Sequence, residues 1–139
     1  MLRGAKVVVN YAKDADGANA TVQTIQAAGG EAKAVQADVA DFKAAEGLIK
    51  TALVVHGGLD ILVNNAGTTR DMVIMMMPEA DWDIVIQTNL KSAFNCSKAA
   101  VKLMLRKRYG RIVNITSVSG LLGGLRWARK RVLGAVRSG

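Results

Sequence analysis

Small and polar residues follow four short apolar runs of this sequence, at the positions where buried strands would end. These segments are Asn10-Tyr11, Asp38-Val39, Asn64-Asn65-Ala66-Gly67 and Thr116-Ser117. In sheets of parallel strands, ligands bind beyond the carboxyl ends of the strands, near the point where the strand order reverses. We therefore expect a ligand site where these four segments meet.

The segments that would position these residues alternate between strand and helix patterns. Short apolar runs, three of them rich in β-branched residues, predict strands over 6–10, 31–37, 59–63 and 111–115. Apolar residues at helical spacing predict helices over 14–28, from Asp41 to the glycines at 57–58, and over 79–108. This alternation predicts an α/β fold made of βαβ units, with a parallel sheet.

Length and composition exclude several classes of protein. The 139 residues suit one domain, and a chain that is 50% hydrophobic is not disordered. One Cys and one His leave too few ligands for a transition-metal cluster, so we expect no metal site. No apolar run approaches the roughly 20 residues of a membrane span, and the N-terminus is no secretory signal. We expect a cytoplasmic protein without a membrane partner.

The net charge of +8 is unevenly distributed along the chain. Residues 126–139 carry five basic side chains and no acid, which leaves +3 for the first 125 residues. A nucleic-acid-binding domain spreads its basic residues over one face or helix and carries a recognisable reading motif. We find no such motif and expect no nucleic-acid partner.

Four motifs, in this order, resemble those of the short-chain dehydrogenase/reductase family. They are Asp38-Val39 at the end of a strand, Asn64-Asn65-Ala66-Gly67 after the strand 59–63, Thr88-Asn89-Leu90 in the long helix, and the run 110–117 that leads to the family's catalytic serine position. The resemblance covers about residues 4–124. It implies a Rossmann-like doubly wound parallel sheet with helices on both faces.

The resemblance also implies catalytic roles for two residues. Ser117 would donate a hydrogen bond to the substrate oxygen and stabilise its developing charge. Asn89 would hold a water molecule in a proton relay. Taken without the resemblance, Ser117 is an ordinary turn residue at a strand end, and Asn89 is a polar side chain that satisfies a local helix irregularity.

Five further residues would contact a nicotinamide cofactor in such a protein. Asn65, Ala66 and Gly67 would line its ribose and nicotinamide side, whereas Asp38 would accept a hydrogen bond from the adenine amine and Val39 would lie against the ring. The alternative readings are a tight turn after a buried strand for the first three and a capping residue for Asp38.

The end of the strand 6–10 indicates which cofactor is preferred. Enzymes that use NAD commonly place an acid there, which binds the ribose 2′-hydroxyl and repels a 2′-phosphate. Here Asn10 is followed by Tyr11, Ala12 and Lys13, with no acid before Asp14. Lys13 could neutralise a phosphate. We therefore expect NADP, with Asn10 among the cofactor-binding residues.

Two parts of the family pattern do not occur in this sequence. The family's first strand and its Gly-rich phosphate-binding turn would precede Gly4, and a Tyr-x-x-x-Lys pair would follow Ser117, yet no Tyr occurs after Tyr109. We expect a partial domain over 1–124, truncated at both ends, and a basic tail over 125–139. The tail is either a frameshifted segment or a genuine basic terminus.

The missing strand has a consequence for the sheet. It would lie centrally, so the strands near Val8 and Val35 should be separated from those near Leu62 and Val113. Both pairs would then have unpaired edges in the middle of the sheet.

Thr69-Arg70-Asp71 and the Met-rich stretch after it resemble the 3-oxoacyl-acyl-carrier-protein reductases in particular. The implied activity is NADP-dependent reduction of 3-oxoacyl thioesters, free or carrier-bound, in fatty acid biosynthesis. We expect this chain by itself to be inactive. The alternatives are another short-chain dehydrogenase, such as an acetoacetyl-CoA reductase or a sugar dehydrogenase, and a non-catalytic partner of a full-length reductase. Homo-oligomers would form through the helix 79–108.

Overall fold

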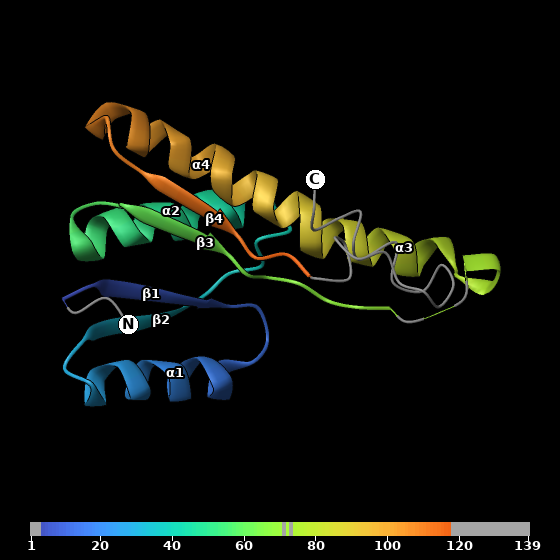
Figure 1. Cartoon of the computed structure of the whole chain (residues 1–139), viewed down its shortest axis with the longest axis horizontal. Helices are drawn as coiled ribbons and strands as arrows, with labels where there is room; N and C mark the ends of the chain where they lie inside the picture. The colour runs from blue at the N-terminus through green and yellow to red at the C-terminus, as the bar shows by residue number, and fades with distance from the viewer. Residues whose placement is uncertain (1–3, 71, 73, 118–139) are drawn as a thin grey trace.

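The computed structural model describes residues 4–70, 72 and 74–117. Within them the chain runs through β1 (Lys6–Tyr11), α1 (Ala15–Ala27), β2 (Glu31–Gln36), α2 (Phe42–His56), β3 (Ile61–Asn64), the 3-10 turn η1 (Ile74–Met76), α3 (Glu79–Val85), the π-helical turn η2 (Ile86–Lys91), α4 (Ser92–Lys107) and β4 (Arg111–Asn114) (Figure 1). The alternation of strands and helices predicted from the sequence is confirmed. The predicted domain boundary at residue 124 and the basic tail 125–139 lie outside the described residues.

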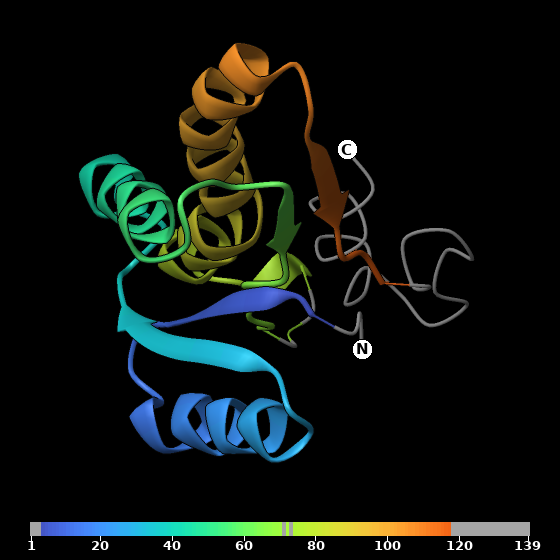
Figure 2. The ribbon, with the colours of Figure 1, turned by 90° about the vertical axis from the view of Figure 1, so that its left-hand side faces the viewer.

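The four strands form two parallel pairs and no continuous sheet among the described residues. β1 pairs with β2 from Lys6 opposite Glu31 onward, and β3 pairs with β4 from Ile61 opposite Arg111 onward. β1 and β3 lie beside each other in both views of the ribbon, but no ladder joins them (Figures 1 and 2). The separation expected for a sheet without its central strand is confirmed.

Helices cover both faces of the first strand pair. α1 packs against one face of β1 and β2, and α2 lies with α4 on the other side, where α4 also contacts β3 (Figure 2). On the second strand pair, the side chains that face away from α2 and α4 are partly exposed, among them Ile61, Val63 and Val113. This is the layered α/β arrangement that the sequence predicted, in incomplete form.

A shared hydrophobic core holds the two strand pairs together. Its buried members are Val39, Ala45, Leu48 and Cys96. The partly buried residues packed against them come from both pairs: Val8 and Val35 from the first, and Leu62 from the second. A second cluster, with Ile49, Ala99, Ala100 and Met104, joins α2 to α4. Apolar packing beneath the helices therefore holds the two strand pairs together, although β1 and β3 make no hydrogen bonds with each other.

Local sequence signals determine where the first helices begin and end. The Asp14 carboxylate accepts a hydrogen bond from the Gly17 N–H at 2.9 Å, and Asp41 accepts hydrogen bonds from the N–H groups of Lys43 and Ala44. α2 ends at His56 and is capped by Gly57, whose φ of 76° lies in the left-handed region that glycine adopts without strain. The predicted beginning of this helix at Asp41 and its predicted end at the glycines 57–58 are confirmed.

The helix predicted over 79–108 consists of α3, η2 and α4 in succession. Its apolar stripe faces outward: Leu90 is 42% exposed, Val101 39% and Leu105 71%. The buried face carries smaller and more polar residues, including Asn89, Ser92, Asn95, Cys96 and Ala99. None of the described helices combines the length and the apolar composition needed to cross a membrane.

Candidate functional site

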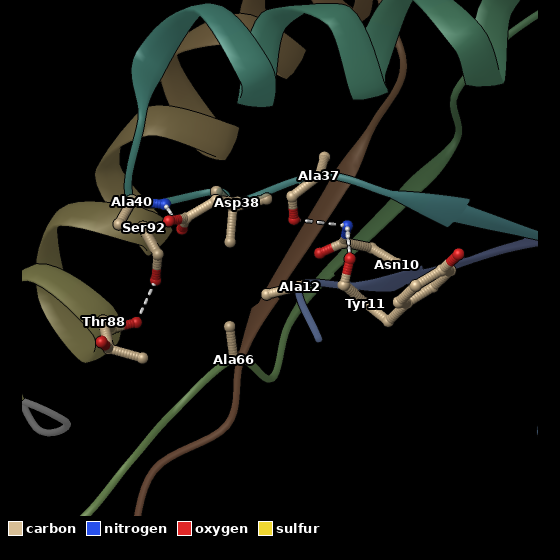
Figure 3. Close-up of a pocket in the computed structure, with 10 residues that line it drawn as sticks. Asn10, Tyr11, Ala12, Ala37, Asp38, Ala40, Ala66, Thr88 and Ser92 are labelled. Carbon is tan, nitrogen blue, oxygen red and sulfur yellow. Dashed lines mark hydrogen bonds between the residues drawn. The ribbon is translucent and has the colours of Figure 1, made fainter. Parts of the chain in front are cut away.

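A pocket of about 190 Å³ opens at the carboxyl ends of β1 and β2, beside the loop that follows β3 (Figure 3). Its walls are formed by Asn10, Tyr11, Ala12, Ala37, Asp38, Val39, Ala40, Ala66, Thr88 and Ser92. Four of the predicted cofactor-binding residues, Asn10, Asp38, Val39 and Ala66, are thus brought together. Three of the four strand ends singled out in the sequence meet here.

The turn after β2 supplies the polar and apolar groups on one side of the pocket. Oδ1 of Asp38 accepts a hydrogen bond from the Ala40 N–H at 3.0 Å, and the Asp38 carbonyl accepts one from the Asp41 N–H at 3.0 Å. Val39 is 8% exposed because it also belongs to the shared core. Oδ2 of Asp38 makes no hydrogen bond within the described residues, so one carboxylate oxygen remains available to a ligand.

The side chain of Asn10 lies at the carboxyl end of the first strand pair and links its two strands. Its Nδ2 donates to the carbonyl of Val35 at 3.2 Å and to that of Ala37 at 3.0 Å. These bonds tie the last residues of β1 to the segment leaving β2. Asn10 therefore shapes the pocket wall, and its Oδ1 is the part of the amide that a ligand could use.

The loop after β3 reaches the pocket through one residue of the predicted motif. Ala66 lines the wall, whereas Asn65 and Gly67 are exposed beside it and are not among the lining residues. Asn64, which precedes them, donates from Nδ2 to Ser97 Oγ at 3.1 Å and to Asn114 Oδ1 at 2.8 Å. The strand end that carries this loop is thereby fixed to α4 and β4.

Asn89 is buried, 7% exposed, and lies within the π-helical turn η2. Its Oδ1 accepts a hydrogen bond from the Thr68 N–H at 2.7 Å, and its Nδ2 donates to the Thr68 carbonyl at 3.0 Å. The side chain thus clamps both backbone groups of one loop residue. π-Helical turns are frequent at functional sites, and this one places a polar side chain against the loop 64–70.

Ser117 lies three residues beyond the end of β4 and is half-buried. Its side chain or backbone interacts with another residue. Neither Ser117 nor Asn89 is among the residues that line the pocket. The structure therefore groups four of the predicted cofactor-binding residues, including the two predicted to contact the adenine, but leaves the two predicted catalytic residues outside this cavity.

Sequence reasoning missed several residues that build the site. Ser92 lines the pocket, and its hydroxyl donates to the carbonyl of Thr88, another lining residue, for which the sequence motif had suggested no place in this site. Asn95 is buried beside the pocket turn. Ser92 and Asn95 had a detectable signal, because they are polar residues at helical spacing on the face that also carries Cys96 and Ala99.

Cys96 is a core residue on the buried face of α4. It is 5% exposed, and burial raises the pKa of its thiol from 9.0 to about 11. A thiol that stays protonated at neutral pH is a poor nucleophile.

Comparison with known proteins agrees with this architecture. The family model described as short chain dehydrogenase matches residues 1–129. The 3-oxoacyl-[acyl-carrier-protein] reductase of Synechocystis sp. is 52% identical over 120 residues, 86% of this chain and 49% of that protein. The 3-oxoacyl-[acyl-carrier-protein] reductase FabG of Staphylococcus aureus is 48% identical over the same shares.

A solved structure gives the same result for the fold. The crystal structure of a short chain dehydrogenase from Mycobacterium avium superposes with a TM-score of 0.84 at 38% identity, covering 98% of this chain and 51% of that one. The chain therefore spans about half the length of the relatives that it matches. On the extent of the family match and the shared fold, this chain belongs to the short-chain dehydrogenase family.

Proposed function

We propose that this chain carries the adenine side of the cofactor site and the catalytic serine of an NADP-dependent reductase, which converts 3-oxoacyl thioesters to 3-hydroxyacyl thioesters. The substrate would be a free or carrier-bound thioester of fatty acid biosynthesis. The observation that carries the proposal is the pocket at the strand ends, in a chain 52% identical to a 3-oxoacyl-[acyl-carrier-protein] reductase. The bound nicotinamide would supply the hydride.

The pocket residues fit the adenine end of a dinucleotide. Ala37 and Val39 provide apolar surface for a flat ring, Oδ2 of Asp38 provides an acceptor for an exocyclic amine, and Ala66 lies where the adjoining ribose would be. Side chains this small leave the ring room to enter between the turn after β2 and the loop after β3.

The end of β1 supports NADP over NAD. Lys13 is exposed two residues after the end of β1, where its ammonium group can form a charged hydrogen bond with a 2′-phosphate. The acid that follows it, Asp14, is engaged at the N-terminus of α1, where it accepts the Gly17 N–H. Because the Asp14 carboxylate caps the N-terminus of α1, it does not need to bind a ribose hydroxyl.

Two residues would act on the substrate side. The Ser117 hydroxyl would donate a hydrogen bond to the substrate carbonyl oxygen as negative charge develops there. Asn89 would hold the relay water with the hydrogen-bonding capacity that its clamp on Thr68 leaves free. Residues 1–139 include no Tyr after Tyr109, so the general acid that completes the proton transfer is not among them.

Activity measurements test this assignment in two stages. Residues 1–139 alone should show no NADPH-dependent reduction of acetoacetyl-CoA above the uncatalysed background, because polarisation without a proton donor does not organise a transition state. Adding a family N-terminal strand with its Gly-rich turn, and replacing 125–139 with a Tyr-x-x-x-Lys helix and the rest of the domain, should produce activity.

The completed protein allows a matched test of the serine. Ser117→Ala should lower kcat by about 10²–10³-fold, the cost of one lost oxyanion donor, whereas Thr116→Ala at the exposed neighbouring position should have little effect. Equal activity of Ser117→Ala and the parent would show that the serine is wrongly assigned. Faster turnover of sugars than of 3-oxoacyl thioesters would favour the alternative dehydrogenase class.

One observation supports a second candidate function, assembly with another subunit. The outer side of the long helix exposes Leu90, Phe94, Val101 and Leu105, and Phe94 is 60% exposed. An apolar stripe opposite the buried face suits helix-to-helix packing. The first turn of α3 is acidic and the last turn of α4 is basic, so an antiparallel second copy would place opposite charges together. We propose homo-oligomers through residues 79–108.

Oligomeric state in solution tests this interface. Light scattering should give a mass above that of one chain, and Phe94→Asp should shift it towards the monomer because a buried carboxylate at the contact is costly. Val54→Asp is the matched control, since Val54 is 84% exposed on α2 and away from the stripe. A monomeric parent, or a Phe94→Asp variant that assembles like the parent, would reject the interface.

A further inference from the structure

Asn95 is the largest fully buried side chain among the described residues, at 2% exposure. It lies on the inner face of α4, next to Cys96 of the shared core. A polar side chain in such a position costs free energy unless its hydrogen-bonding groups are satisfied. Its partners therefore show what the amide does in this fold.

The Asn95 amide holds the turn that forms one wall of the pocket. Its Nδ2 donates to the Val39 carbonyl at 3.0 Å and to the Ala40 carbonyl at 3.0 Å. A primary amide nitrogen carries two hydrogens, so each carbonyl receives one. Because both acceptors are carbonyl oxygens, the amide must be oriented with its nitrogen, and not its oxygen, towards them.

The other hydrogen bonds of this turn are local. Asp38 bonds to Ala40 through its side chain and to Asp41 through its carbonyl. These contacts shape the turn but do not fix it to the rest of the molecule. Packing of Val39 in the shared core holds the turn from the inside, and the amide of Asn95 adds the hydrogen-bonded link, because it joins two consecutive carbonyls to α4 across 55 and 56 positions in the sequence.

We propose that Asn95 is a positioning residue, which fixes the turn at residues 38–40 in its ligand-binding shape and thereby sets the affinity of the pocket for the adenine end of a nucleotide. The identity of that ligand rests on the proposed function. Asp38, Val39 and Ala40 all line the pocket, so a turn released from α4 would move an acceptor and an apolar wall together. Asn95 itself does not line the pocket.

The test replaces the donor and keeps the shape. Asn95→Asp is nearly isosteric but, when ionised, has no hydrogen to donate, and Asn95→Ser keeps one hydroxyl hydrogen for two carbonyls. Met104→Ala is the control, because it removes buried side-chain volume in the second cluster, away from the turn. The ligand probe is adenosine 2′,5′-bisphosphate, followed by NMR titration.

We expect Asn95→Asp to weaken binding by at least about ten-fold and Asn95→Ser by less, with Met104→Ala close to the parent. Amide hydrogen exchange at Ala40 and Asp41 should accelerate in the Asn95 variants and not in Met104→Ala. If Asn95→Asp does not fold, Asn95→Ser carries the comparison. Parental affinity in the folded Asn95 variants, or equal weakening by Met104→Ala, would overturn the proposal.

The same experiment separates this proposal from the proposed function. A parent chain that does not bind the bisphosphate contradicts the adenine assignment, and hydrogen exchange then decides the role of Asn95. Faster exchange of the turn amides in the Asn95 variants alone supports positioning of the turn, whereas the same exchange in Met104→Ala overturns it.

Discussion

Cys96 lies where the two strand pairs share one core, so the reactivity of its thiol reports whether that core stays closed. It packs with Val39 and Leu48, and with Val8 and Leu62 from the two different pairs. We predict that the native thiol reacts far more slowly with a disulfide reagent than the same thiol in urea. Burial slows the reaction by two routes, through the ionisation of the thiol in the closed core and through the reagent's access to it.

The ionisation effect follows from the pKa. The thiolate is the reactive form, and at pH 8 a thiol with the ordinary pKa of 9.0 is about one-tenth ionised, whereas one with a pKa of about 11 is about one-thousandth ionised. This alone slows modification of Cys96 by about 100-fold. The side chain is also 5% exposed, and a route through local opening of the core, in which the thiol regains its ordinary pKa, is slowed instead by the free energy of that opening.

The assay compares modification rates at pH 8 by absorbance. The matched control combines Cys96→Ala with Lys102→Cys, which moves the only thiol to an exposed position on the same helix. The control should react at similar rates with and without urea. A native Cys96 that reacts within about ten-fold of the exposed control would refute the reasoning, because it would mean that the shared core is open.

Two further predictions concern stability. Leu48→Ala should lower the free energy of unfolding by about 2–5 kcal/mol in a urea titration, because it opens a cavity between the two strand pairs, whereas Val54→Ala on the exposed side of α2 should change it by less than about 0.5 kcal/mol. Stability should also fall as pH rises from 9 towards 11, because the unfolded Cys96 thiol releases its proton at lower pH than the folded one; the loss is about 2–3 kcal/mol at most, and Cys96→Ala should lack it.

The secondary structure was largely predictable because its signals are local. The β-branched run at 6–10, the cap at Asp41 and the glycine at 57 each act within a few residues. The gathering of Asn10, Asp38 and Ala66 also followed from sequence, because the ends of parallel strands meet at one edge.

The rest depends on contacts between distant residues. The spacing of apolar residues around Asn89 does not distinguish a π-helical turn from an α-helix. The hydrogen bonds between Asn89 and Thr68 join residues that are 21 positions apart in the sequence. The outer stripe with Leu90 and Leu105 has the apolar spacing of a buried face, yet the smaller residues on the other side permit closer packing and are the ones buried. Asn95 likewise acquires its role only from carbonyls that folding brings to it.

A titration of this chain with NADPH, followed by amide shifts in NMR spectra, tests the central claim most directly. We predict binding no tighter than about millimolar, roughly −4 kcal/mol, because the pocket holds the adenine end and residues 1–139 contain no Gly-rich turn for the pyrophosphate. The shifts should concentrate at residues 37–40 and at Ala66. Micromolar affinity, or shifts confined to other parts of the chain, would contradict the account.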